Sequence, residues 1–435
     1  MYPNLYYAFK DLFGVGEKWQ FLRFINSFGF FVALAFVAAA VVIANELRRK
    51  SKQGLLHYEE EKIVVGKPAS FSELLVNFLV GFVMGYKIIG AFISDSPLAA
   101  NPPDFIFSSE GSWPMGITLG LLFAGLKWWE KNKQKLAKPE VRTIRIWPHD
   151  RVGDIVIMAA IFGFLGAKIF HNLENWDELV KDPLGSLLSF SGLTFYGGLI
   201  CAALAIWYYA KKHGIGFWHL NDAAAPALMI AYAIGRIGCQ VSGDGDWGIL
   251  NSAYAASPEG KISRASEQQF RSALELNSNF FTRQFGSMDQ VHHANFPGVS
   301  FLPDWLFAYS YPNNVINEGV TMPGCTGQYC SYLPIPVFPT PLYETIVCLC
   351  LFLVLWLIRK KIRVPGAIFA IYLILNGTER FFVENIRVNS TYSIYGFHPT
   401  QAEIISFLLV ITGILLLIFL PRKHRSQTQR AAAAR

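Results

Sequence analysis

The sequence predicts an all-α, polytopic membrane protein with about nine transmembrane helices. Of its 435 residues, 52% are hydrophobic and 16% are charged, whereas a soluble domain carries about 25% charged residues. Aromatic residues make up 15% of the chain, and amphipathic aromatic rings collect at the two interfaces of a bilayer. This composition excludes a disordered chain, a collagen-like fibre and an ordinary cytosolic enzyme.

Nine apolar runs are long enough to cross, or nearly cross, about 30 Å of hydrocarbon. They cover residues 24–44, 73–93, 113–129, 152–172, 193–210, 222–240, 341–358, 365–383 and 403–420. We therefore expect six spans in residues 1–240, with 73–129 as an added helical hairpin, and three spans in residues 341–420.

The distribution of basic residues predicts the orientation of these spans. With the N-terminus outside, the cytoplasmic segments hold 25 Lys and Arg residues and the opposite side holds 9. Because Lys and Arg are enriched in cytoplasmic loops, we expect an outside N-terminus and a basic cytoplasmic tail at 421–435. The basic residues form no stripe on a soluble face, so nucleic acid is not an expected partner.

Residues 241–340 contain no spanning run and are rich in polar residues and proline. On this topology they form an extracytoplasmic domain, large enough for a small core of its own. Cys325 and Cys330 lie in it, and in an oxidising compartment we expect them to form a disulfide, with two free thiols as the alternative. The chain has no CxxC pair and no cluster of histidines near its cysteines, so we predict no metal site.

Charged side chains within spanning helices cost about 2.5–3.5 kcal/mol each and are usually functional. Arg236 and Arg380 lie near the outer ends of two predicted helices, and Gly235 and Gly238 flank Arg236, allowing close approach of another helix or a ligand. A guanidinium binds a phosphate through two parallel hydrogen bonds. Two arginines at this depth therefore indicate a site for a phospholipid headgroup.

Other charged residues share this level of the membrane. Arg380, Glu384 and Arg387 have the spacing i, i+4, i+7 and lie on one face if the helix continues that far. The alternative for any such cation is snorkelling, in which a long side chain reaches the headgroups and does nothing else. We favour snorkelling for Lys87 and Lys168 but not for Arg236.

Several sequence blocks resemble those of the prolipoprotein diacylglyceryl transferase family. The stretch Gly-Arg-Ile-Gly-Cys-Gln-Val-Ser-Gly-Asp-Gly-Asp-Trp-Gly at 235–248 resembles the family signature. Four further blocks follow the family's order: 195–200 resembles His-Gly-Gly-Leu-Ile, 339–344 resembles Pro-Ser-Gln-Leu-Tyr-Glu, 380–387 resembles Arg-x-x-x-Glu-x-x-Arg, and Gln401 opens the last helix. The resemblance extends from about residue 24 to 420, interrupted by insertions at 60–135 and in much of 250–335.

This resemblance implies an enzyme of the bacterial inner membrane whose active site faces the outer leaflet. It implies transfer of the diacylglyceryl group of phosphatidylglycerol to the lipobox cysteine of a secreted prolipoprotein, the first step of lipoprotein maturation. The products would be a thioether and glycerol 1-phosphate. The implied partners are phosphatidylglycerol, prolipoprotein signal peptides and the lipid bilayer, and no cofactor is needed.

The resemblance also assigns roles to individual residues. The expected catalytic residues are Arg236, Arg380 and Tyr196. The expected phosphatidylglycerol-binding residues are Arg236, Arg380, Gly197, Gly198, Asp244, Glu384 and Arg387. For Asp244 and Glu384 we favour orienting the two arginines, because unpaired guanidinium groups near hydrocarbon are costly; the alternative is to accept hydrogen bonds from the lipid glycerol.

Tyr196 departs from the family, which has a histidine at this position. A tyrosine hydroxyl has a pKa of about 10 and is a poor base unless strongly perturbed. We expect Tyr196 to act as a neutral donor to the lipid; an interfacial tyrosine and a phenolate base are the alternatives.

The loss of the family histidine leaves a second function open, that of a non-catalytic or transport-type membrane protein that binds phospholipid headgroups. A transporter is expected to have inverted repeats and helices broken at the midplane. The polar residues here cluster at the outer level instead, which counts against transport.

Overall fold

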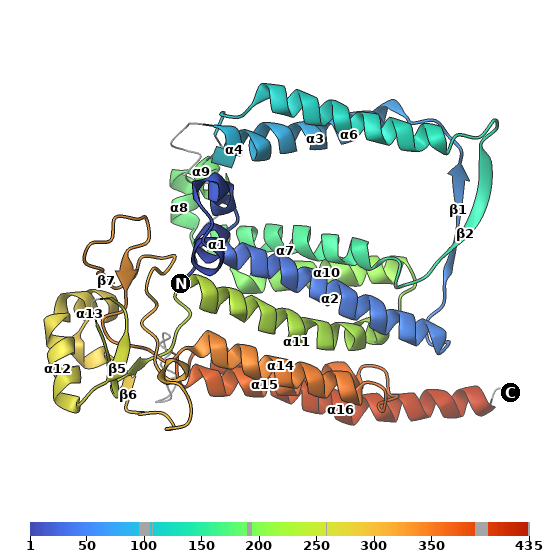
Figure 1. The fold of residues 1–435 in the computed structure, drawn as a ribbon. Helices are drawn as coiled ribbons and strands as arrows, with labels where there is room; N and C mark the ends of the chain where they lie inside the picture. The colour runs from blue at the N-terminus through green and yellow to red at the C-terminus, as the bar shows by residue number, and fades with distance from the viewer. Residues whose placement is uncertain (95–104, 107, 189–193, 258, 388–398, 434–435) are drawn as a thin grey trace. The chain divides into compact units, whose positions relative to one another are not determined.

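The computed structural model describes residues 1–94, 105–106, 108–188, 194–257, 259–387 and 399–433 (Figure 1). It divides into two compact units. The first unit is Met1–Glu46 with Trp218–Arg435, and the second unit is Leu47–Phe217. Residue 193, the expected start of the fifth span, and the last two residues of the tail lie outside the described residues.

Each of the nine predicted runs falls on a helix among the described residues. These helices are α2 (Ser27–Lys52), α3 and α4 (Phe71–Val83 and Gly90–Ile93, joined by the π-helical turn η2, Met84–Ile89), α6 (Trp113–Lys133), α7 (Val152–Glu174), α10 (Phe195–Lys212), α11 (Phe217–Ser242), α14 (Thr340–Ile358), α15 (Ala367–Glu384) and α16 (Gln401–Ala433). Shorter helices are α1 (Leu5–Phe13), η1 (Glu17–Phe24), α8 (Trp176–Lys181) and α9 (Pro183–Leu188).

Within the described part of the chain, six of these helical segments are long and apolar enough to cross a membrane: α2, α3–α4, α7, α11, α14 and the part of α16 up to Arg422. The chain is therefore a polytopic membrane protein. α15 is as long as a short span but carries Glu379, Arg380 and Glu384 in its 18 residues. Nine spans, their orientation and the extracytoplasmic domain remain predictions.

Glycines allow the helices of the second unit to pack closely. A Cβ added at Gly81 or Gly85 of α3–η2 would lie 2.5 or 2.1 Å from a backbone carbonyl oxygen of α6. On the other side of the same contact, a Cβ added at Gly116 or Gly120 of α6 would meet aromatic rings of the α3–η2 segment. Small residues four apart on both helices are a recurrent basis for helix association in membranes.

The second unit also contains an antiparallel ribbon of β1 (Glu59–Val65) and β2 (Glu140–Ile146). In the same unit, Lys87 donates hydrogen bonds to the carbonyl oxygens of Phe105, Ser108 and Glu110 at 3.2, 2.5 and 2.7 Å. Its ammonium group therefore binds the chain itself, which the snorkelling interpretation did not anticipate.

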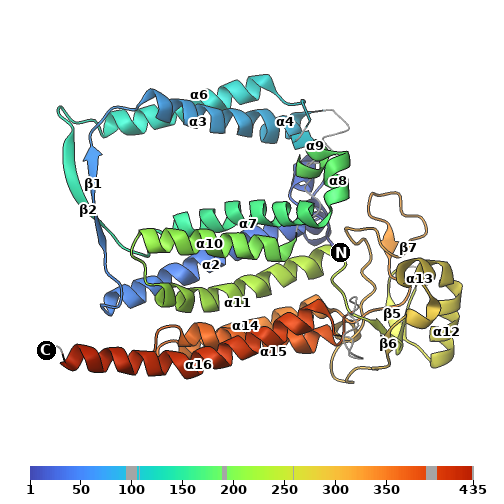
Figure 2. The ribbon, with the colours of Figure 1, turned by 180° about the vertical axis from the view of Figure 1, so that it is seen from behind.

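In the first unit, α14, α15 and α16 lie side by side, with α11 next to them (Figure 2). The start of α15 is fixed by buried Asp222 of α11, whose carboxylate accepts hydrogen bonds from the backbone N–H groups of Gly366 and Phe369 at 2.9 and 3.2 Å. A carboxylate at a helix N-terminus satisfies donors that have no partner within the helix. This contact sets the position of α15, and with it that of Arg380.

Residues 243–339, which we call the head segment, connect α11 to α14. Its elements are β3 (Leu250–Asn251), β4 (Tyr254–Ala256), β5 (Ile262–Arg264), α12 (Glu267–Leu276), α13 (Ser278–Phe285), η4 (Met288–Gln290), β6 (His293–Ala294), η5 (Asp304–Leu306), β7 (Val320–Thr321) and β8 (Ser331–Tyr332). Its strands form two-stranded pairs: β3 with β6 in parallel, and β4 with β5 and β7 with β8 antiparallel.

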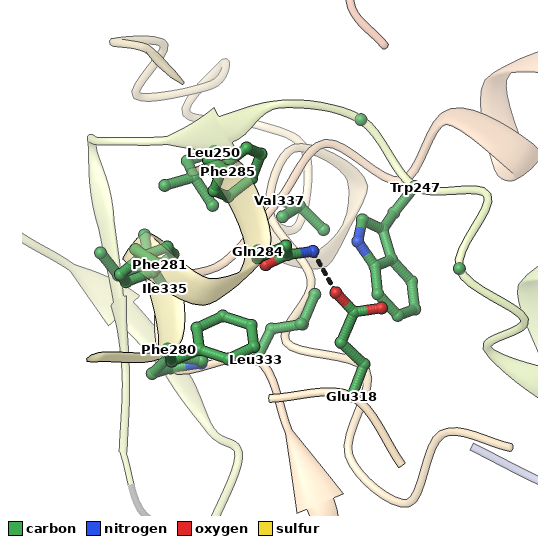
Figure 3. A pocket seen from close by; sticks show the side chains of 13 residues that line it. Trp247, Leu250, Phe280, Phe281, Gln284, Phe285, Glu318, Leu333, Ile335 and Val337 are labelled. Atoms are coloured by element: carbon green, nitrogen blue, oxygen red, sulfur yellow. Dashed lines mark hydrogen bonds between the residues drawn. The ribbon is translucent and has the colours of Figure 1, made fainter. Parts of the chain in front are cut away.

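The head segment has a buried core of its own. Phe270 and Phe281, from α12 and α13, pack with Leu250, Tyr311 and Ile335, which are all less than 5% exposed. Figure 3 shows Phe281 and Phe285 of α13 on one side of this region and Trp247 on the other. The polar composition of the segment thus conceals enough apolar residues for a small core.

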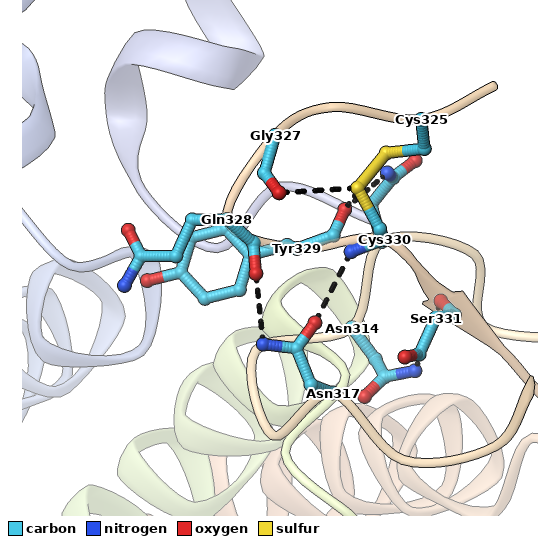
Figure 4. The surroundings of a disulfide bond; sticks show 9 residues. Asn314, Asn317, Cys325, Gly327, Gln328, Tyr329, Cys330 and Ser331 are labelled. Carbon is cyan, nitrogen blue, oxygen red and sulfur yellow. Dashed lines mark hydrogen bonds between the residues drawn. A yellow bond between two sulfur atoms is a disulfide. The ribbon is translucent and has the colours of Figure 1, made fainter. Parts of the chain in front are cut away.

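The structure contains the expected disulfide between Cys325 and Cys330. Asn317 holds the same loop through two hydrogen bonds, from its Nδ2 to the Gln328 carbonyl at 2.9 Å and from the Cys330 amide to its Oδ1 at 3.1 Å (Figure 4). The disulfide and this asparagine together fix the loop that follows β7.

Candidate active site

Three arginines of the first unit meet at one end of its helices. Arg236 lies in α11, Arg380 in α15, and Arg387 three residues beyond α15. Two acidic residues lie among them, Glu344 in α14 and Asp246 in the head segment. We call these five residues the arginine cluster.

Glu344 is the centre of the cluster. Its side chain is 0% exposed, and its carboxylate lies 2.8 Å from Arg236 Nε, 3.3 Å from Arg387 Nη1 and 3.8 Å from Arg380 Nη1. The hydroxyl of Tyr232 donates a further hydrogen bond to it. A buried carboxylate is tolerated only when charges and donors of this kind compensate its lost hydration.

Asp246 bridges two of the same arginines. Its Oδ2 contacts Arg236 Nη1, and its Oδ1 lies 2.6 Å from Arg387 Nη2. Burial by itself would raise the pKa of the Asp246 carboxyl, but the two guanidinium groups outweigh it and hold that pKa below its ordinary value. Asp246 is therefore a charged partner that orients both arginines.

The turn after α11 explains how Asp246 reaches back to Arg236. Gly243 and Gly245 have φ angles of +65° and +98°, which residues other than glycine rarely adopt. The hydroxyl of Thr340 then donates to the Asp246 carbonyl at 2.7 Å. The glycines of the signature thus reverse the chain, and the first residue of α14 holds it there.

Arg380 forms a second pair along its own helix. Its Nη2 lies 3.1 Å from Glu384, whose side chain is 1% exposed, at the i, i+4 spacing expected from the sequence. Its Nη1 is buried but makes no hydrogen bond within the described residues. This nitrogen lies 3.8 Å from Glu344, which is within ion-pair distance but beyond a hydrogen bond.

Asp244 lies near the cluster but is not the partner of Arg236. The structure gives that contact to Asp246, two residues later, which sequence reasoning passed over. Asp244 Oδ1 accepts from the Asp246 amide at 3.4 Å, and burial raises the pKa of Asp244. The signature carries an additional residue before its tryptophan here, and counting positions did not reveal which aspartate faces the arginine.

Glu344 and Glu379 were also missed as site residues. Glu344 was visible in the block at 339–344, yet only the structure reveals that three arginines share it. Glu379 is 5% exposed, and neither of its carboxylate oxygens has a hydrogen bond within the described residues. Its position beside Arg380 on a predicted spanning helix was the signal that the sequence offered.

Cys239, Asp244 and Asp246 offer three ligand atoms within 4.8 Å of one another. This spacing alone would permit a metal ion. However, the Asp246 carboxylate already contacts the guanidinium groups of Arg236 and Arg387, and their positive charge would oppose a divalent cation at the same place. The Asp246 carboxylate is therefore already paired with two arginines.

The other expected site residues, Tyr196, Gly197 and Gly198, belong to the second unit. All three lie in the first turn of α10, where a Cβ added at Gly197 would meet Phe170 at 2.3 Å and one at Gly198 would meet the Gly163 carbonyl at 2.7 Å. The two glycines therefore allow α10 to pack on α7. Tyr196 precedes the two glycines in the same turn.

The fold and the cluster define a polytopic membrane protein with a buried, arginine-rich site. A family model described as prolipoprotein diacylglyceryl transferase matches residues 115–419. The chain belongs to this family, and it is a transferase.

Similar proteins named phosphatidylglycerol–prolipoprotein diacylglyceryl transferase occur in several bacteria. The one from Shouchella clausii is 26% identical over 275 residues, covering 62% of this chain and 76% of the relative. The one from Dehalococcoides mccartyi is 25% identical over 277 residues, covering 64% and 80%. The one from Pseudomonas aeruginosa is 25% identical over 297 residues, covering 66% and 82%.

Replacing the central carboxylate should destabilise the fold. Glu344→Gln leaves three guanidinium groups around a neutral side chain, and removing one partner of a buried ion pair typically costs about 3–5 kcal/mol. Denaturant unfolding of the protein in detergent micelles measures this loss. The control is Glu267→Gln, which breaks the exposed pair with Arg271 and should cost less than about 1 kcal/mol. Equal losses in the two variants would contradict a central role for Glu344.

The stabilisation provided by Asp246 should depend on pH. Because its pKa is lower in the folded protein, its ion pairs stabilise the fold fully above the ordinary Asp pKa of about 3.9. That stabilisation is lost as the pH falls through the lowered value. We expect the thermal unfolding midpoint of the wild type to exceed that of Asp246→Asn at pH 7, with the difference disappearing at acidic pH. A difference that is constant from pH 7 to pH 3 would contradict this assignment.

Proposed function

We propose that this protein transfers the diacylglyceryl group of phosphatidylglycerol to the lipobox cysteine of a secreted prolipoprotein. The products are a thioether-linked lipoprotein and glycerol 1-phosphate. Family membership and the names of the relatives support the general reaction. The single observation that carries the proposal for this chain is the convergence of Arg236, Arg380 and Arg387 at one end of the helices.

The arginine cluster suits a lipid phosphate because of its charge and its position. Its three guanidinium groups are balanced by Glu344, Asp246 and the neighbouring Glu384 in the resting protein. A phosphodiester brings its own negative charge and can take over contacts now made by a carboxylate. The side chain of Arg380 is 24% exposed, more than those of Arg236 and Arg387, so it is the first group that the phosphodiester would meet.

The reaction needs stabilisation of its leaving group. The cysteine sulfur attacks the glycerol carbon of the diacylglyceryl group, and the carbon–oxygen bond to phosphate breaks with its electron pair going to the phosphate oxygen. The thiol proton ends on the phosphate, so no further reactant is required. Fixed donors directed at developing negative charge are the usual way to accelerate such a step, and the arginines would provide them here.

The thiol must also be activated, because a free thiol has a pKa near 8.5 and the thiolate is the nucleophile. A guanidinium group beside the sulfur would favour the thiolate. Tyr196, in place of the family histidine, would supply a neutral hydroxyl to the lipid rather than act as a base. Gly197 and Gly198 would contribute by the close packing that positions the start of α10.

We also propose that nine helices cross the bacterial inner membrane, with the N-terminus and the head segment outside and the basic tail in the cytoplasm. The 25-to-9 distribution of basic residues supports this orientation. It would let the cluster face the outer leaflet, where secreted prolipoproteins arrive. Labelling of single cysteines with a membrane-impermeant reagent tests this orientation. If a cysteine near residue 426 is labelled in intact cells, the tail lies outside and the proposed orientation is wrong.

Complementation of transferase-depleted bacteria tests the function. We expect the chain to restore growth and the mass of a lipoprotein's N-terminal cysteine to increase by one diacylglyceryl group. An unmodified cysteine despite good membrane expression would contradict the proposal and favour the non-catalytic alternative.

Substitutions of the arginines should remove transfer. Arg236→Ala and Arg380→Ala each delete a donor to the leaving group, and loss of one such donor typically costs about 2.7–4 kcal/mol of transition-state stabilisation. Arg236→Lys should remain poor, because an ammonium group cannot replace the planar guanidinium that contacts both Glu344 and Asp246. An assay with purified protein and a lipobox peptide measures the rates. Near-normal activity of Arg236→Lys would reduce Arg236 to a structural cation.

Tyr196→Phe distinguishes the roles proposed for the tyrosine. If the hydroxyl is a neutral donor, the variant should lose part of its rate and keep the same pH dependence. Tyr196→Ala, which also removes the aromatic ring from the start of α10, should lower the rate further. Complete loss of transfer in Tyr196→Phe with retained binding of phosphatidylglycerol would instead identify Tyr196 as the base.

A further inference from the structure

A cavity of about 240 Å³ lies in the head segment beside the arginine cluster. Most of its lining residues are aromatic or aliphatic, and the Phe280 ring of α13 lies beside Leu333 (Figure 3), but polar atoms, including those of the backbone, provide slightly more of its exposed lining than carbon atoms do. One polar pair, Gln284 and Glu318, also lines it, and the Gln284 amide donates to the Glu318 carboxylate. Ligand cavities that combine an apolar lining with a few placed polar groups are typical binding sites.

The wall of this cavity is continuous with the proposed active site. Gly245 and Trp247 line the cavity and flank Asp246, the carboxylate that bridges Arg236 and Arg387. Two residues on, Gly248 lines the cavity and pairs with Arg387 in an isolated β-bridge. A molecule in the cavity would therefore contact residues that are next to Asp246 in the chain or paired with Arg387.

The chemistry of the cavity excludes the lipid substrate. Its described lining residues include no Lys, Arg or His, and they include the acidic Glu318, so an anionic headgroup is disfavoured. The volume is below the range of about 300–1,000 Å³ that holds drug-sized ligands, which is too small for two acyl chains. A single amino-acid residue fits both parts of the lining: its apolar side chain would contact the aromatic and aliphatic residues, and its peptide N–H groups would lie beside the Glu318 carboxylate.

The position of Glu318 is built into the fold. Its amide donates to Asn314 Oδ1 at 2.8 Å, and Asn314 Nδ2 donates back to the Glu318 carbonyl at 2.9 Å. Asn314 is itself 0% exposed. The acidic group of the cavity therefore sits on a fixed backbone rather than on a freely moving loop.

We propose that this cavity binds an apolar side chain of the prolipoprotein, within the first few residues after the cysteine that receives the lipid. This proposal rests on the proposed function. Residues before that cysteine form the apolar signal sequence in the bilayer, whereas those after it lie on the side of the thiol, next to the head segment. An extended chain advances about 3.3–3.6 Å per residue, so only a few residues are needed to leave the cluster and reach the cavity wall.

Photocrosslinking to synthetic peptides tests the contact directly. One lipobox peptide has phenylalanine at the second and third positions after the cysteine, and its match has glycine there. A version of the first peptide carries a benzophenone-bearing phenylalanine at the second position as the probe, and a control peptide carries it ten positions further on; both are used with the full-length protein in phosphatidylglycerol-containing nanodiscs. We expect crosslinks to the residues of α13 that line the cavity from the first probe only. Crosslinks to lipid, or equal crosslinks to α13 and to exposed Gln268 of α12, would overturn the proposal.

Kinetics with blocking variants provide the second measurement. Gln284→Trp should fill the cavity and raise the KM for the phenylalanine peptide by about tenfold or more, the range for losing apolar contacts in a pocket. It should leave the KM for the glycine peptide unchanged, as should the control Gln268→Trp for both peptides. For each peptide, the KM of Gln284→Trp is compared with that of Gln268→Trp. If the two variants have the same KM for both peptides, the assignment is contradicted. If the wild type lipidates neither peptide, the proposed function fails, and the crosslinks alone decide whether the cavity binds peptide.

Discussion

The buried carboxylate of Glu344 is the constraint on which the first unit depends. Burying one carboxylate and three guanidinium groups costs several kcal/mol per ion unless they compensate one another. Compensation here requires α11, α14, α15 and the head segment to end at one place, because each contributes a member of the cluster. The same arrangement that satisfies Glu344 therefore aligns the arginines for a ligand.

This dependence explains several features that would otherwise be unrelated. Asp222 fixes the start of α15, and thereby the level at which Arg380 meets Glu344. The left-handed glycines at 243 and 245 return the chain after α11, and thereby bring Asp246 to Arg236. Asp222 and the two glycines thus determine where the charged side chains of the cluster lie.

The sequence was sufficient to predict the helical ranges, because apolar runs of this length have few other structures. The i, i+4 pair of Arg380 and Glu384 also followed from spacing alone. The disulfide of Cys325 and Cys330 followed from the location of two nearby cysteines in a segment expected to face an oxidising compartment. Side-chain partners between elements did not follow. Spacing does not indicate whether Asp244 or Asp246 turns inward, nor that one glutamate serves three arginines, since both depend on how distant elements pack.

In two places the structure gives a residue a different contact from the one that the sequence predicted. Gly197 and Gly198 were expected to approach a lipid, and the structure uses them for the contact of α10 with α7. Lys87 was expected to reach toward headgroups, and it instead binds three backbone carbonyls. In both cases the residue type was informative about close approach or charge, while the partner was determined by tertiary packing.

The central claim is that the arginine cluster receives the phosphate of phosphatidylglycerol and stabilises its departure. The most direct measurement is phosphorus NMR of the purified protein in phosphatidylglycerol nanodiscs during reaction with a lipobox peptide. The account predicts a new phosphomonoester signal from glycerol 1-phosphate, equal in amount to the thioether product and absent when the peptide cysteine is replaced by serine. Thioether formation without a phosphomonoester, or neither product despite bound peptide, would contradict it.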